Sequence, residues 1–283
     1  MARTTFHIFR HAEGVHQVSD EALTRRDAEL TEAGRQQCAE LRAAAPDALP
    51  WKGGRVRHVI SSPLRRTLQS CLLAFEPVLA RPQGPDDAGL LVVAVPDLTE
   101  AGSRVSSFGS DPAVLAAEFN SAGDGKNKVR VDLSRVEQGW NSFDLSSKYA
   151  YSVEKLETRA ADVRAYLRRM AAELEKEEET HVIVMTHSVV AHFVTEDYEG
   201  IAPDRRSAWA DNLAHRSYRF EGPDRLVETP ESRVRTGLPP VSTLTDEEKR
   251  ALREHFMKRH YDRTAEVEAR MREAAAAEAR LDS

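Results

Sequence analysis

The chain has 283 residues, of which 41% are hydrophobic and 30% charged, and its formal net charge is -6. This composition is typical of a folded globular protein, and it argues against a nucleic-acid binder that works through massed positive charge. The apolar runs around Val59 and Val184 are only a few residues long, far short of the roughly 20 residues that a membrane-spanning helix needs. We therefore expect neither a nucleic-acid nor a membrane partner.

Short runs rich in β-branched residues alternate with helical patterns, which predicts an α/β protein whose parallel strands are joined by crossover helices. The strands end at polar positions, and two helices open with residues typical of a helix start, Thr31 and Pro63. In chain order the predicted elements are a strand over Thr4–Phe9, a helix over Thr31–Ala45, a strand over Val56–Ile60, a helix over Pro63–Leu79, a strand over Leu90–Val95, a helix over Val153–Glu177, a strand over His181–Met185 and a helix over Val189–Asp197.

The periodic pattern is interrupted twice. Residues 101–152 show little periodicity and are interpreted as an insertion within one domain that covers residues 1–220. Residues 221–283 are expected to form a C-terminal extension, in which a polar stretch is followed by a long charged helix over Thr245–Arg280. This helix is predicted to pack on the surface or to project from it.

Cys38 and Cys71 are the only cysteines, too few for a disulfide framework or a zinc cluster. The first residues also lack the apolar segment of a secretory signal. A cytoplasmic location is therefore expected.

Polar residues follow each predicted strand: Arg10 and His11 the first, Arg66 the second, Glu100 the third and His187 the fourth. Because ligands of open parallel sheets bind beyond the carboxyl ends of the strands, we expect these side chains to share one site. Guanidinium groups bind phosphate oxygens, a neutral imidazole attacks phosphorus, and a carboxylic acid protonates a leaving oxygen. Nearby arginines also disfavour protonation of His11, which keeps it nucleophilic.

These residues lie in motifs that resemble those of the histidine phosphatase superfamily, the phosphoglycerate-mutase-like clan. The motifs are Arg10–Gly14, Ser62–Thr67, Leu98–Glu100 and Thr186-His187. Flanking positions resemble fungal members in particular. The resemblance covers about residues 4 to 220, and it implies a three-layer sandwich with a mostly parallel central sheet flanked by helices.

The resemblance also implies roles for individual residues. His11 would become phosphorylated, Arg10 and Arg66 would bind the phosphate, His187 would complete the pocket and stabilise the transferring group, and Glu100 would donate a proton. Three further residues are possible substrate contacts: His16, Arg65 and Ser188. Neither a metal nor another cofactor is implied, because arginines and histidines supply the positive charge.

The predicted function is hydrolysis of a small-molecule phosphate or diphosphate ester through a phosphohistidine on His11. A phosphomutase of the same superfamily is one alternative, because it shares the first chemical step. A repurposed enzyme or a binding protein that keeps the anion pocket is another, since Ser188 replaces a usual glycine and the stretch after Glu100 is unusual. The expected partner is a small phosphorylated molecule, and the sequence does not indicate an oligomeric state.

Overall fold

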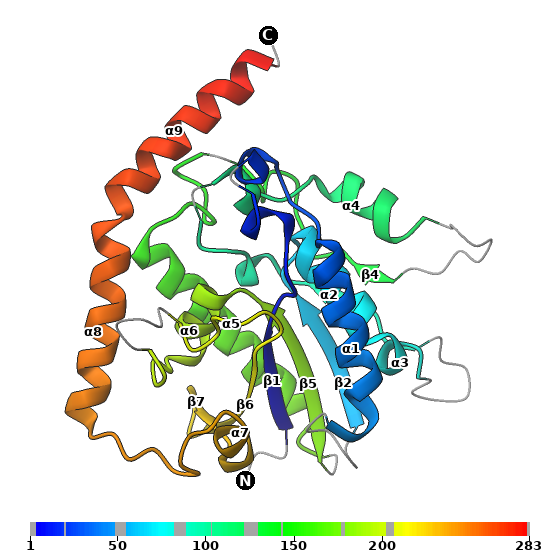
Figure 1. The fold of residues 1–283 in the computed structure, drawn as a ribbon, viewed down its shortest axis with the longest axis vertical. Helices are drawn as coiled ribbons and strands as arrows, with labels where there is room; N and C mark the ends of the chain where they lie inside the picture. The colour runs from blue at the N-terminus through cyan, green and yellow to red at the C-terminus, as the bar shows by residue number, and fades with distance from the viewer. Residues whose placement is uncertain are drawn as a thin grey trace.

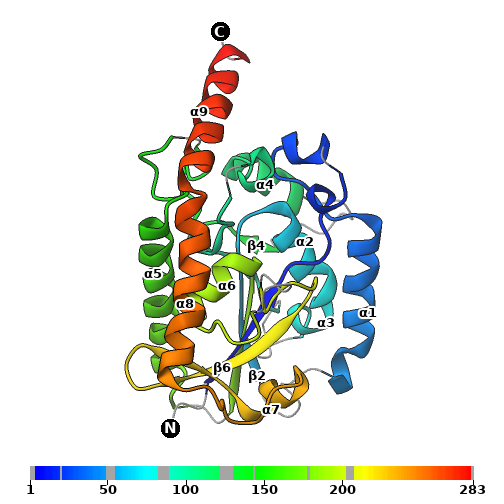
Figure 2. The same ribbon diagram turned by 60° about the vertical axis from the view of Figure 1, so that its left-hand side comes forward.

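The central feature of the computed structural model is a mixed β-sheet between two layers of helices (Figures 1 and 2). The structure describes residues 4–19, 21–48, 55–81, 89–102, 104–121, 130–142, 144–176, 179–201 and 207–281. Within these residues the sheet has seven strands in the order β4-β3-β2-β5-β1-β6-β7. The predicted α/β class and its three layers are confirmed.

Five neighbouring strands of this sheet are parallel, and two antiparallel strands extend it at one edge. The strands are β1 (Thr4–Arg10), β2 (Arg55–Ser61), β3 (Val92–Ala94), β4 (Val131–Asp132), β5 (Thr180–Thr186), β6 (His215–Glu221) and β7 (Arg225–Glu228). In the centre, β5 pairs with β1 on one side and β2 on the other, both in parallel. The carboxyl ends of β1, β2 and β5 therefore lie together at one edge, as the sequence predicts.

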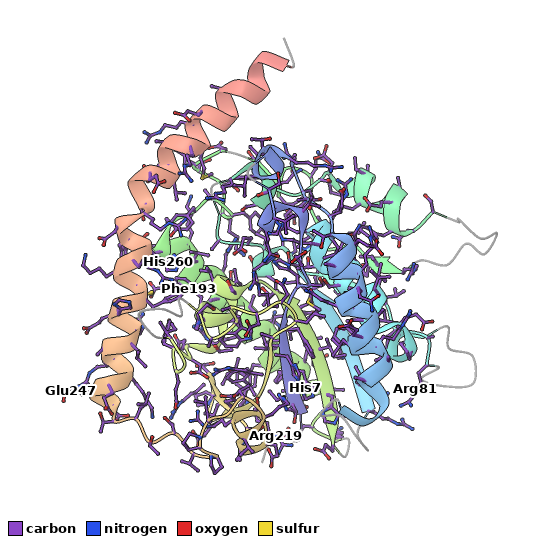
Figure 3. The ribbon with its side chains drawn as sticks, viewed as in Figure 1. His7, Arg81, Phe193, Arg219, Glu247 and His260 are labelled. Atoms are coloured by element: carbon purple, nitrogen blue, oxygen red, sulfur yellow. The ribbon has the colours of Figure 1, made fainter. Side chains whose placement is uncertain are left out.

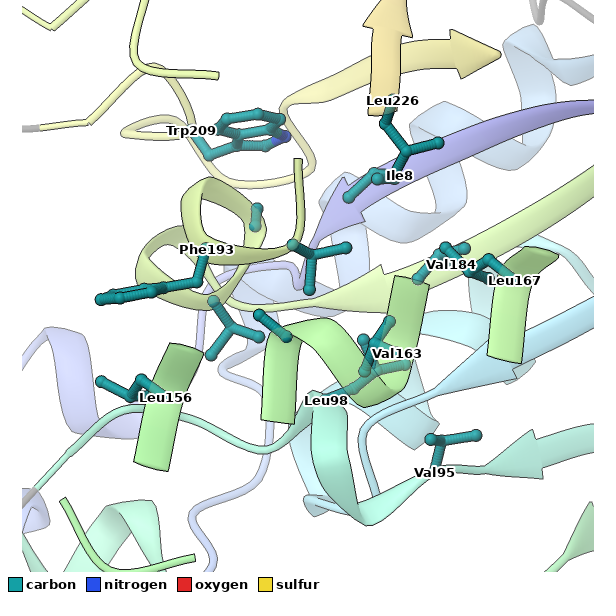
Figure 4. Close-up of a cluster of buried hydrophobic side chains, with 14 of the residues drawn as sticks. Ile8, Val95, Leu98, Leu156, Val163, Leu167, Val184, Phe193, Trp209 and Leu226 are labelled. Carbon is teal, nitrogen blue, oxygen red and sulfur yellow. The ribbon is translucent and has the colours of Figure 1, made fainter. Parts of the chain in front are cut away.

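Helices cover both faces of the sheet, and the side chains of each strand alternate between them. On β1, Phe6 and Ile8 pack in the layer of α5 (Val153–Glu173) and α6 (Ser188–Thr195), as the close-up in Figure 4 shows for Ile8. Phe9 faces the opposite layer. That second layer contains α1 (Glu32–Ala48), α2 (Arg65–Ala74), α3 (Glu76–Leu79) and α4 (Pro112–Phe119).

The helix predicted over Pro63–Leu79 is two helices. Leu64 has an extended backbone and α2 begins only at Arg65, so Pro63 lies before the helix rather than in its first turn. Phe75 adopts a non-helical conformation between α2 and α3. Pro77 explains the break, because proline has no N–H to continue the hydrogen bonds of α2.

The charged tail also forms two helices instead of one, α8 (Asp246–Asp262) and α9 (Thr264–Leu281). The side chain of Thr245 caps α8, in agreement with the predicted start. The carbonyl of His260 accepts hydrogen bonds from the hydroxyls of Tyr151 and Thr264, and these compete with helix continuation near Arg263. In Figure 1, α8 lies along the domain and α9 projects beyond it towards the C-terminus.

Several elements were not predicted. Within residues 101–152 the structure contains α4 and the edge strand β4, which pairs with β3. The sheet also continues past residue 220, because β6 ends at Glu221 and β7 pairs with it before α7 (Pro230–Arg235). The residues of β6 are mostly polar or charged, so its sequence lacks the apolar run by which the central strands were recognised.

None of the described helices is long and apolar enough to cross a membrane. Cys38 in α1 and Cys71 in α2 are both buried and unbridged. A cytoplasmic location stays a prediction.

Candidate active site

The side chains predicted for the site meet beyond the carboxyl ends of the parallel strands. His11 directly follows β1, Arg66 lies in the first turn of α2 after β2, and His187 follows β5. Glu100 follows β3 after a short 3-10 turn, Pro96–Leu98. The imidazole rings of His11 and His187 are 5.0 Å apart between centroids. The structure thus brings together residues up to 176 positions apart in the chain.

His11 is held in one tautomer. Its Nδ1 lies 2.7 Å from the backbone carbonyl oxygen of Ala12, and because a carbonyl only accepts, Nδ1 must carry the hydrogen. In the neutral ring, Nε2 then has a free lone pair. Burial, followed by the charges of Arg66 and Arg10, holds the pKa of His11 well below its ordinary value. The arrangement therefore presents a neutral, nucleophilic nitrogen.

The loop that carries His11 is supported by the start of α1. The hydroxyl of Thr31 donates to the carboxylate of Glu13 at 2.6 Å and accepts from the amide of Gly34 at 2.9 Å. A side chain on Gly34 would place its Cβ 2.1 Å from the Glu13 carbonyl oxygen. Gly34 is therefore needed for the close approach of helix and loop.

His187 lies opposite His11 and is fully buried. Its Nε2 is 3.0 Å from the hydroxyl of Ser62, and its Nδ1 is 3.5 Å from both Nη2 of Arg66 and a carboxylate oxygen of Glu100. Burial and the Arg66 charge hold its pKa well below the ordinary value. His187 also occupies the N-cap position of α6, without a capping hydrogen bond from its side chain, and this end of a helix favours negative charge.

Two guanidinium groups supply positive charge. Arg66 is buried and donates from Nη1 to the carbonyl of Ser106 at 2.9 Å. Arg10 donates from Nη1 to the carbonyls of Trp209, at 3.3 Å, and Ala210. In both groups the buried Nε has no hydrogen-bond partner among the described residues. Such donors are suited to the oxygens of a bound phosphate.

Glu100 lies at the border of the pocket, with 18% of its side chain exposed. One carboxylate oxygen accepts from the amide of Ala101 at 2.8 Å, and the other faces His187. It can therefore exchange protons with solvent while it contacts the buried groups. This is the position that a general acid requires.

The three possible substrate contacts differ in position. The ring of His16 lies 5.6 Å from that of His11, and burial together with Arg66 and Arg10 lowers the pKa of His16 to about 3. Ser188 is half-buried in the first turn of α6. The guanidinium of Arg65 instead binds Glu118 of α4 at 2.6 Å. Arg65 thus contacts the insertion rather than the group around His11.

A metal ion is one ligand to consider at this site. Within the part of the chain that the structure describes, ligand atoms of His11, Glu100 and His187 lie within 4.8 Å of one another. However, Arg10 and Arg66 border the same space, and their charges repel a cation and attract an anion. An oxyanion is therefore the better match to these residues, and metal independence stays a prediction.

Some groups of the site were not predicted. Ser62, which contacts His187, was named only as part of a motif and not as a site residue. Its position directly after β2 and before a proline is the sequence signal that could have placed it at the sheet edge. The carbonyls of Ser106, Trp209 and Ala210 carry no sequence signal, because any residue type can supply a carbonyl.

Comparisons with known proteins agree with the fold. The model of the histidine phosphatase superfamily (branch 1) matches residues 6–83, and no curated protein sequence matches the chain. The ecdysone phosphate phosphatase from Bombix mori, solved in complex with tungstate, is 16% identical with a TM-score of 0.52, covering 86% of this chain and 95% of that chain. Phosphoglycerate mutase from Bacillus anthracis is 14% identical with a TM-score of 0.45, covering 80% of this chain and 91% of its own. The likeness to fungal members stays a prediction.

Proposed function

We propose that this chain, which belongs to the histidine phosphatase superfamily, is a phosphatase that hydrolyses a small-molecule phosphate or diphosphate ester through a phosphohistidine on His11. One observation carries the proposal. The hydrogen bond from Nδ1 of His11 to the Ala12 carbonyl leaves Nε2 unprotonated, in a pocket bordered by two guanidinium groups and His187. This combination suits attack on a phosphoryl group.

In the first step, Nε2 of His11 forms a bond to phosphorus while the bond from phosphorus to the ester oxygen breaks. The proton of Glu100 passes to the leaving oxygen. Arg10, Arg66 and His187 bind the other phosphoryl oxygens and stabilise their charge in the transition state.

In the second step, the Glu100 carboxylate removes a proton from water, whose oxygen attacks phosphorus. The bond from phosphorus to Nε2 breaks, which restores neutral His11 and protonated Glu100 and releases inorganic phosphate. A phosphomutase would use a hydroxyl of a bound product in place of this water.

The decisive experiment is a search for the covalent intermediate. After a brief reaction with a labelled aryl phosphate, we expect an acid-labile, alkali-stable label on the wild-type protein and none on His11→Ala. His255→Ala, which changes an exposed histidine of α8, should keep the label. A label that persists in His11→Ala would contradict the assigned nucleophile, and loss of labelling in a chelator would contradict metal independence.

The fate of this label separates the remaining functions. Release as inorganic phosphate supports hydrolysis, whereas transfer to an added alcohol or sugar phosphate supports a mutase. A protein that binds vanadate between His11, Arg10, Arg66 and His187 but forms no label would be a binding protein or a repurposed enzyme. A panel of metabolite phosphates would then identify the substrate of an active protein.

A further inference from the structure

The carboxylate of Asp27 has no part in the phosphoryl-transfer steps, yet it is fully buried. Its two oxygens bind two different segments: Oδ1 accepts from the amide of Arg65 at 2.8 Å, and Oδ2 accepts from the amide of Ser110 at 2.9 Å. Arg65 is the first residue of α2, whereas Ser110 belongs to the insertion. One side chain therefore connects the start of α2 to the insertion.

The backbone of Asp27 is adapted to this position. Its φ of 50° lies in the left-handed region, which few residues other than glycine adopt and which aspartate tolerates better than most. Neighbouring Arg26 reinforces the link, because its Nε donates to the carbonyl of Gly109 at 2.8 Å.

The insertion is rigidly supported where Asp27 binds it. The indole Nε1 of Trp140 donates to the carbonyl of Ser110 at 3.1 Å. The side-chain amide of Asn141 donates to the Gly109 carbonyl at 3.0 Å and to the Asp111 carboxylate at 2.9 Å. A Cβ on Gly109 would lie 2.2 Å from the Trp140 ring. The segment from Gly109 to Asp111 is therefore closely packed, and movement of Ser110 would disturb its neighbours.

Both segments that Asp27 binds also hold Arg66. Arg66 directly follows Arg65 in α2, so the amide bound by Oδ1 sets where the Arg66 side chain begins. Its guanidinium donates to the carbonyl of Ser106, four residues before Ser110. In addition, the charges of Asp27 and Arg66 attract each other. The base and the head of the Arg66 side chain are thus both connected to Asp27.

We infer that Asp27 is a positioning residue, which holds the Arg66 guanidinium in place for oxyanion binding by joining α2 to the insertion. The inference rests on the proposed function only in that it requires an oxyanion site at Arg66. Without the link, the start of α2 and the segment around Ser110 would lose their shared buried anchor, and Arg66 would lose its defined position.

The test measures vanadate binding by calorimetry, without turnover. In Asp27→Asn, a side-chain NH2 group replaces one of the two carboxylate oxygens and faces a backbone N–H group, so one of the two hydrogen bonds is lost. We expect vanadate affinity to fall about ten-fold. In the Arg66→Ala background the same substitution should change affinity by less than about two-fold, because its effect passes through Arg66. Equal effects in both backgrounds would overturn the inference.

Two more variants sharpen this test. Glu118→Ala removes another link between α2 and the insertion, the partly exposed pair with Arg65, and should leave vanadate affinity within about two-fold. If Asp27→Asn does not fold, Asn141→Ala replaces it in the test. This substitution removes the hydrogen bonds to Gly109 and Asp111 and leaves α2 unchanged. It should weaken vanadate binding in the wild-type background but not in the Arg66→Ala background. Unchanged affinity in Asn141→Ala would then overturn the inference.

The result is distinguishable from a failure of the proposed function. A wild-type protein that binds vanadate but forms no label on His11 rejects hydrolysis through phosphohistidine and leaves the role of Asp27 to the binding data. A wild-type protein that binds no vanadate overturns the positioning role itself.

Discussion

The nucleophilic character of His11 comes from burial, two arginines and one backbone carbonyl. Arg66 and Arg10 disfavour its protonation, as expected from the motifs, but burial is the larger cause of its lowered pKa. The Ala12 carbonyl then decides which nitrogen carries the hydrogen. Burial and the two arginines thus keep the ring neutral, whereas the hydrogen bond to Ala12 opposes them by raising the pKa but keeps the hydrogen on Nδ1 and leaves Nε2 free for attack.

This environment predicts an unusual pH dependence at His11. A lowered pKa means that His11 stays neutral as the pH falls through about 6.5, the ordinary value for histidine. The rate of labelling by p-nitrophenyl phosphate should therefore show no titration midpoint near pH 6.5 between pH 8 and 6. The leaving group of this substrate needs little protonation, so the rate reports on His11. Single-turnover labelling across this range measures it, and a half-point near 6.5 would mean that His11 is accessible to solvent protons.

Helix α8 shows how a charged element is held to the domain. Its sequence predicts a surface helix, and most of its residues are indeed exposed, but a narrow stripe of Phe256, Met257 and His260 is buried. The ring of Phe256 lies 4.8 Å from that of His192 and 5.1 Å from that of Tyr198, between centroids. Figure 3 shows His260 on α8 beside Phe193 of α6.

The stability of this contact can be measured through Phe256, which is 1% exposed. Phe256→Ala should lower the free energy of unfolding by about 3 to 5 kcal/mol, because it removes buried apolar area and leaves a cavity. Tyr261→Ala, at a neighbouring position that is 48% exposed, should change it by less than about 0.5 kcal/mol. Urea unfolding compares the two, and similar losses would show that α8 is not anchored through Phe256.

Buried histidines are spread over the whole molecule. Six of the described histidines are at most 2% exposed: His7, His11, His181, His187, His192 and His260. Burial is the largest cause of the lowered pKa of each, with values of about 3 for His192 and about 4 for His260. The folded protein therefore keeps these rings neutral where the unfolded chain would protonate them.

Acid should consequently destabilise the fold. Below pH about 6.5 the unfolded chain binds protons that the folded state cannot, so the free energy of unfolding should fall steadily from pH 6.5 towards pH 4. Urea unfolding at several pH values measures this slope. His192→Asn should reduce the slope by removing one such group, and a stability that does not change between pH 7 and 5 would contradict the explanation.

What the sequence determined by itself is local. The central strands β1, β2, β3 and β5 are short apolar runs, and His11, Arg66, Glu100 and His187 follow them at short distances, so both the parallel sheet and the grouping of these residues were predictable. The helix boundaries at Thr31 and Thr245 were predictable for the same reason, since a cap involves residues within one turn.

Only the tertiary structure decided the features that depend on contacts between distant segments. Strands β4 and β6 exist because β3 and β1, distant in the chain, complete their hydrogen bonds, and β7 in turn pairs with β6; their own residues show little preference for a strand. The break between α8 and α9 involves a hydrogen bond from Tyr151, which is distant in the chain, to the His260 carbonyl, whereas Pro77, which explains the break between α2 and α3, is visible in the sequence. Likewise, backbone carbonyls hold Arg10 and Arg66, and a backbone amide links Ser110 to Asp27. Every residue carries such groups, so no sequence pattern can identify them.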